Sequence, residues 1–155
     1  MLFKNVVLVH DFLVQMGGAE RVVAAFTRIF PTSSLYVSLT RYKSLSDDFR
    51  DVRIYNTFLQ LLPFKGKLHK IIFPLYPVSF ALLNIPRSTE IVIVSCTTFS
   101  KFISTHASVK KVLYCHNMPR FFYDESYIRG VITNSFLRSL ARFIFPIIKY
   151  FDRKV

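Results

Sequence analysis

VVLVHDFLVQMGGAERVVAAFTRI, residues 6–29, is the segment that indicates the fold class of this chain most clearly. It opens with Val6-Val7-Leu8-Val9, a continuous apolar run that predicts a strand buried on both faces of a parallel sheet. Gly17-Gly18 follows after a short loop, and residues 19–29 then carry apolar side chains at helical spacing up to Pro31. Strand, glycine loop and helix in this order predict the first half of a βαβ unit.

Further strand-like segments alternate with helical stretches along the rest of the chain. They are Leu35–Leu39, Val52–Tyr55, Ile91–Ser95 and Lys111–Cys115. The alternation predicts an α/β fold, a Rossmann-like doubly wound and mostly parallel sheet, in one domain over residues 1–155. Ligands bind such sheets beyond the carboxyl ends of the strands. The segments in which we expect chemistry are therefore 11–20, 97–101 and 116–124.

Composition bounds the class of protein. With 155 residues and 52% hydrophobic side chains the chain can build a core, which excludes a disordered protein. The net charge of +12 suggests an anionic partner, namely nucleic acid, a lipid surface or phosphorylated small molecules, unless it serves solubility alone. The aromatic side chains lie mainly in apolar runs, which disfavours nucleic acid. Two cysteines make no disulfide framework, so a cytoplasmic setting is expected, without a membrane-spanning segment.

The C-terminal segment predicts an amphipathic helix with a kink at Pro146. One stripe of it is basic and consists of Arg138, Arg142, Lys149 and Arg153. The opposite arc is apolar and consists of Phe136, Leu140, Phe143, Ile144, Ile147, Ile148 and Phe151. Such a helix either packs its apolar arc on the sheet with a solvated basic face, or lies on the anionic inner face of the cytoplasmic membrane. The two readings are compatible.

Polar residues and glycines at the predicted strand ends are the candidates for chemistry. Gly17-Gly18 before a helix lets a backbone approach a ligand and attracts phosphate. The chain lacks both the dinucleotide fingerprint and the Walker motif, which argues against a dehydrogenase and a P-loop NTPase. His10-Asp11 and His116 follow strands and are either structural or part of the ligand crevice. No metal is expected, because Cys115-His116 has no second pair at zinc-like spacing. A nucleophilic Cys115 is disfavoured because its strand should be buried.

Three motifs, in order along essentially the whole chain, resemble those of family 4 glycosyltransferases. The family's opening, V-H-D-W…G-G-x-E, is similar to His10-Asp11-Phe12 and Gly17-Gly18-Ala19-Glu20. Its S-F-L-Q-x-L-P segment is similar to Phe58-Leu59-Gln60 with Leu62-Pro63. Its Y-C-H-T-P-x-R-Y-x-W-D element is similar to residues 114–120 (YCHNMPR) with Tyr123-Asp124. The chain departs from the family at Phe12 and Tyr123, where Trp is usual, and at Asn117, where Thr is usual.

The resemblance implies a GT-B fold of two Rossmann-like domains, of which this chain would be the N-terminal, acceptor-side domain, incomplete at its C-terminus. It implies a retaining enzyme that moves a sugar from a nucleotide diphosphate donor to a cell-surface polysaccharide or lipid-linked glycan without a metal. The donor site would belong to an absent C-terminal domain, so this chain alone should be inactive. The chain would then be a gene fragment, a remnant or half of a split enzyme.

The resemblance also assigns roles to individual residues. His116 would be catalytic and contact the donor sugar, while Gly17, Gly18 and Glu20 would form the loop near the donor phosphates and the acceptor. The acceptor side would contain His10, Asp11, Arg120 and Asp124. The alternative is a non-catalytic basic module that binds a membrane surface or nucleic acid, which rests on the charge and on the basic helical stripe.

Overall fold

The sheet of this protein is entirely parallel and has the strand order β3-β2-β1-β4-β5. The computed structural model describes residues 5–62, 75–117 and 135–152. The strands are β1 (Val6–His10), β2 (Ser34–Val37), β3 (Arg53–Asn56), β4 (Ile91–Cys96) and β5 (Lys110–Cys115). The order reverses between β1 and β4, which lie side by side in the centre. This arrangement confirms the predicted α/β, Rossmann-like parallel sheet.

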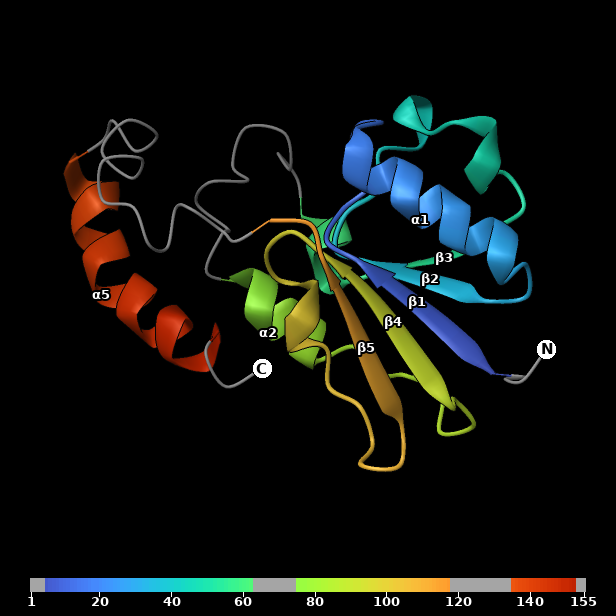
Figure 1. The fold of residues 1–155 in the computed structure, drawn as a ribbon. Helices are drawn as coiled ribbons and strands as arrows, with labels where there is room; N and C mark the ends of the chain where they lie inside the picture. The colour runs from blue at the N-terminus through green and yellow to red at the C-terminus, as the bar shows by residue number, and fades with distance from the viewer. Residues whose placement is uncertain (1–4, 63–74, 118–134, 153–155) are drawn as a thin grey trace.

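Helices cover both faces of the sheet (Figure 1). The α-helices are α1 (Gly18–Ile29), α2 (Leu75–Ala81) and α5 (Ser135–Asp152). Short 3-10 helices complete the connections: η1 (Tyr42–Ser44), η2 (Asp47–Phe49), η3 (Phe58–Leu61) and η4 (Ser100–Phe102). Helix α1 packs on one face, and α2 and η4 pack on the other, while α5 lies beyond α2 and reaches the core on that face through Ile148. Within the described residues, no helix is long and apolar enough to span a membrane.

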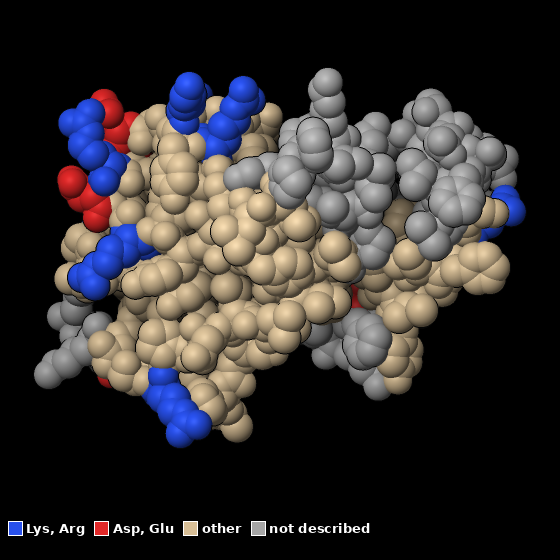
Figure 2. Space-filling view, turned by 180° about the vertical axis from the view of Figure 1, so that it is seen from behind, with Lys and Arg blue, Asp and Glu red and all other residues tan. Residues whose placement is uncertain are grey.

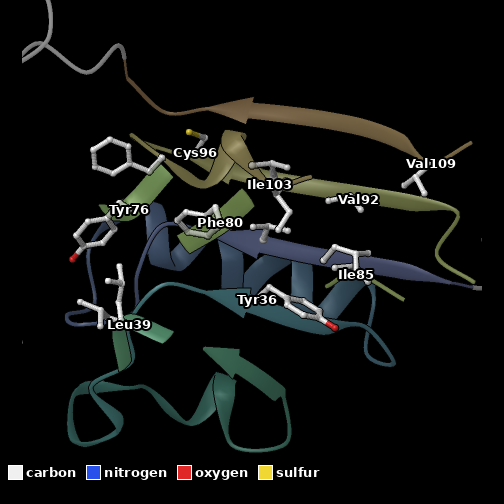
Figure 3. Close-up of a cluster of buried hydrophobic side chains, with 14 of the residues drawn as sticks. Tyr36, Leu39, Tyr76, Phe80, Ile85, Val92, Cys96, Ile103 and Val109 are labelled. Carbon is white, nitrogen blue, oxygen red and sulfur yellow. The ribbon is translucent and has the colours of Figure 1, made fainter. Parts of the chain in front are cut away.

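Two apolar cores lie on either side of the sheet because successive strand residues point to opposite faces. Val6 and Leu8 of β1 pack against Val23 of α1 in the first core. The second core contains Val7 and Val9 together with side chains of β4, α2, η4 and α5, and Figure 3 shows its labelled members spread along one face of the sheet. Strand β1 is thus buried on both faces, as its uninterrupted apolar run predicts.

Strand β5 does not have the predicted burial. All six of its residues are exposed, including Cys115, so the expectation that the strand buries this thiol is wrong. The physical reason is its place in the sheet: β5 pairs with β4 along one edge, and among the described residues no strand pairs with its other edge. The apolar composition of a strand predicts sheet membership but does not distinguish a central position from an edge.

Helix α5 is a single helix with Pro146 inside it, and only part of its apolar arc contacts the second core. Ile148 is buried and Ile144 is half-buried in the second core, but Phe143 and Ile147 are exposed. Of the predicted apolar arc, Phe143 and Ile147 therefore do not take part in the packing of the domain. The helix is rotated about its axis so that Asp152, near its end, forms a buried ion pair with Lys101 of η4.

Candidate functional site

The carboxyl ends of β1, β4 and β5 meet at one edge of the sheet, where the strand order reverses. The parallel register places His10, the last residue of β1, beside Ser95, one residue before the end of β4. His116 follows directly after β5, and its backbone N–H donates to the carbonyl of Cys96 at 2.9 Å. This edge is the position at which doubly wound sheets bind ligands.

Ser95 holds two imidazoles at this edge. Its carbonyl accepts a hydrogen bond from His10 Nδ1 at 2.9 Å, and its Oγ lies 2.7 Å from His116 Nε2. The ring centroids of His10 and His116 are 6.4 Å apart, with the rings nearly perpendicular. The ring of Tyr114 packs against His116 with a centroid distance of 4.9 Å, so that both sides of the His116 side chain are positioned by the protein.

Because a carbonyl can only accept, His10 must carry a proton on Nδ1. Its Nε2 then points into the interior, where it has no hydrogen-bond partner among the described residues. The closest charged atom is Oε1 of Glu20, at 4.0 Å, which is beyond hydrogen-bonding distance but within reach of electrostatic attraction. His10 and Glu20 are both buried, so this contact connects the end of β1 to the start of α1.

Glu20 in turn caps helix α1. Its Oε2 accepts a hydrogen bond from the backbone N–H of Gly17 at 2.9 Å, which satisfies a donor at the helix start. Burial by itself raises the pKa of Glu20, but contact with His10 and the backbone N–H groups of Glu20 and Gly17 outweigh it, so the pKa is lowered. The carboxylate is therefore ionised at neutral pH.

The two glycines of the loop differ in what surrounds them. A Cβ at Gly17 would lie 2.9 Å from Oε2 of Glu20, so any larger residue would displace the capping carboxylate. The backbone of Gly17 is extended, so its glycine is required by space and not by a positive φ angle. A Cβ at Gly18 would meet no atom within 4 Å. Gly17 therefore has a structural explanation, whereas the open side of Gly18 leaves room for a ligand.

The carboxylate of Asp11 accepts four backbone hydrogen bonds. Its side chain is buried, with an exposed fraction of 1%, and both oxygens accept backbone N–H groups from the loop after β4. Oδ2 accepts from Thr97 at 2.5 Å and Thr98 at 2.7 Å, and Oδ1 accepts from Phe99 and Ser100, each at 2.7 Å. Asp11 thus ties the end of β1 to the start of η4 and shapes the floor of the strand-end edge.

His116 is the half-buried titratable group at this edge. Burial lowers its pKa, and so does the nearby His10, and together these effects outweigh Asp11 and Glu20, which raise it. The imidazole of His116 is consequently neutral at pH 7. A neutral imidazole has one donor nitrogen and one acceptor nitrogen, and Ser95 engages Nε2, which leaves Nδ1 to interact with a ligand.

The structure brings six of the predicted site residues together. Contacts connect His116 to His10, His10 to Glu20, and Glu20 to the Gly17-Gly18 loop, while Asp11 lies directly after His10. Of the basic stripe, Arg142 is exposed and Lys149 is half-buried. The side chains of Arg120, Asp124, Arg138 and Arg153 lie outside the described residues.

Sequence reasoning missed Ser95, which positions both histidines. Its position at the end of a buried strand, next to the switch in strand order, was the signal that could have identified it. In the described part of the chain, no group of three or more His, Cys, Asp or Glu side chains could hold a metal ion. An open hollow lined by residues of the segment 42–54 lies beside β3, the outermost strand on the side of the sheet away from β5. It shares no residue with this site.

Comparisons of the chain with protein-family models, with curated proteins and with solved structures gave no match. The chemistry of the strand-end edge and the order of the motifs are therefore the basis on which a function is proposed.

Proposed function

We propose that this chain is the acceptor-side, N-terminal half of a GT-B glycosyltransferase of family 4 type. The single observation that supports it best is the cluster of His10, Ser95 and His116 at the carboxyl edge between β1, β4 and β5. It coincides with two of the three motifs that resemble the family. The enzyme would be retaining, would need no metal, and would work at the inner face of the cytoplasmic membrane on a polysaccharide or lipid-linked glycan acceptor.

In this proposal His116 contacts the sugar of a nucleotide diphosphate donor. Its lowered pKa keeps the imidazole neutral, so its free nitrogen forms a hydrogen bond with a sugar hydroxyl without the cost of burying a charge. Ser95 and Tyr114 hold the ring in one orientation, which avoids a loss of rotamer freedom when the donor binds.

Gly18 would let the donor phosphates or the acceptor approach the start of α1, because its open side leaves space and a helix N-terminus attracts anions. The stabilisation of the departing nucleotide diphosphate requires cations or oriented donors. In the proposed enzyme these belong to a donor-binding domain. The 155-residue chain by itself is accordingly expected to transfer no sugar.

The test is a reconstitution. Sequencing the DNA downstream identifies a candidate donor domain, and the two chains are mixed and assayed for transfer of labelled sugar to a membrane extract. We expect transfer only from the mixture, and a loss of at least about a hundredfold in His116→Ala, of the order found for groups that act on the reacting centre. His106→Ala is the matched control, because His106 is an exposed histidine in the connection before β5. Transfer by the isolated chain, or equal activity of the two variants, would contradict the proposal.

A further inference from the structure

The outer surfaces of α2 and α5 are apolar although both helices face solvent. On α5 the exposed fractions are 76% for Phe143, 59% for Ile147 and 56% for Tyr150. These residues recur at spacings of four and three, which places them on one side of the helix. Leu75 and Val78 of α2, with Leu82 directly after it, are likewise exposed. We call these six residues the α2–α5 face.

Both helices contribute side chains to the second core, on the side of the sheet away from α1, and α5 lies beyond α2 in Figure 1. Segment 75–82, LYPVSFAL, contains no charged residue. Among the described residues that Figure 2 draws from behind, most of the surface is uncharged and the basic side chains lie mainly toward its margins. Single exposed apolar side chains are ordinary on protein surfaces, but several on adjacent elements of one side indicate a surface that is covered in use.

The charges of α5 indicate what covers it. Arg142, which is exposed, precedes Phe143 and borders the apolar row. Asp152 is the one acidic residue in segment 135–152, and it is turned inward to pair with Lys101. The outward charge of α5 is therefore basic, and the chain as a whole carries +12. An anionic lipid surface satisfies both features, since it accepts aromatic and aliphatic side chains below the headgroups and binds basic ones at their level.

A second copy of the chain fits this surface poorly. Two molecules that each carry +12 would have to bring the basic margins of their faces together, and like charges repel. We therefore propose that the α2–α5 face lies on an anionic membrane, with Phe143, Ile147 and Tyr150 inserted among the headgroups. The membrane contact itself is independent of the proposed function. Only its use, to bring a lipid-borne acceptor to the strand-end site, rests on the proposed function.

The chain offers a sharp test because it contains no tryptophan. Phe143→Trp places a single indole on the face, and Ile29→Trp places one at the end of α1 on the opposite side of the sheet, where Ile29 is exposed. Vesicles of about three parts phosphatidylcholine to one part phosphatidylglycerol are added, with bromine-labelled lipid as quencher. We expect a blue shift and quenching for the first variant and neither for the second, because only the α2–α5 face enters the lipid.

Sedimentation with the same vesicles measures affinity. Ile147→Ser should lower the partition coefficient about tenfold, and Ile29→Ser, an equally exposed isoleucine, should leave it unchanged. Arg142→Gln should weaken binding about fivefold on anionic vesicles and not on pure phosphatidylcholine, with Arg21→Gln of α1 as its control. All of these side chains are exposed, so the variants should fold, which circular dichroism verifies.

Several results would overturn the inference: no binding to anionic vesicles, equal effects of Ile147→Ser and Ile29→Ser, or a wild-type dimer in sedimentation velocity that Ile147→Ser dissociates. None of these measurements needs a sugar donor. Vesicle binding through the α2–α5 face without sugar transfer in the reconstituted mixture would support this inference and reject the proposed glycosyltransferase. Sugar transfer without vesicle binding would support the proposed glycosyltransferase and reject this inference.

Discussion

Asp11→Asn tests whether the buried carboxylate organises the strand-end edge. The substitution keeps the shape of the side chain but replaces one oxygen with an NH₂ group. Each oxygen of Asp11 accepts two backbone N–H groups, so the amide leaves two buried donors facing another donor. It also converts the two remaining bonds from charge-assisted to neutral ones.

The magnitude follows from these four bonds. A hydrogen bond to a charged group contributes about 1.5–3 kcal/mol, so two lost bonds amount to roughly 3–6 kcal/mol. Burying a neutral amide costs less than burying a carboxylate, which offsets part of this loss. We expect Asp11→Asn to lower the free energy of unfolding by about 3 kcal/mol. For a chain of 155 residues this corresponds to a fall in Tm on the order of 10 °C.

Urea unfolding followed by far-ultraviolet circular dichroism measures the change, with Asp47→Asn as the matched control. Asp47 is exposed and pairs with Arg50 on the surface, so its substitution should cost less than about 1 kcal/mol. If the midpoints and slopes of the two variants coincide, the carboxylate of Asp11 does not hold the loop after β4, and the reasoning is refuted.

Three further predictions follow from individual side chains. Gly17→Ala should lower the free energy of unfolding by about 1–2 kcal/mol, since its Cβ displaces the capping carboxylate, whereas Gly18→Ala should leave it unchanged or raise it by up to about 1 kcal/mol. Equal losses in urea unfolding would reject this. Cys115 should react rapidly with a thiol reagent in the native protein and Cys96 only after unfolding, because Cys96 is buried and its pKa is raised to about 12. Two fast thiols would contradict the packing. The pKa of His116 is lowered on folding, so the unfolded chain binds its proton more readily, and stability should fall as the pH drops through about 6.5. His116→Asn should have a flatter stability profile there, and an unchanged slope would show that folding does not shift this group.

Much of the architecture could be predicted from local pattern. The uninterrupted apolar run of β1 required burial on both faces, and parallel pairing with β2 and β4 provides it. Because parallel strands bring their carboxyl ends to one edge, His10 and His116 could be placed near each other although they are 106 positions apart in the sequence. The identity of Ser95 as their common partner could not be predicted, because it depends on the register of β1 against β4.

The α/β class, the glycine loop before α1 and the edge at which chemistry is expected can be predicted from the sequence, because strand and helix periodicities are local properties of the chain. Three features depend on the folded arrangement: Asp11 binds backbone groups 86 to 89 positions away, Gly17 makes room for a capping carboxylate, and β5 is exposed. The folded arrangement also determines which side of α5 faces outward. Hydrophobic periodicity shows that a helix has an apolar arc, but the rotation of the helix depends on contacts with distant residues such as the Lys101–Asp152 pair.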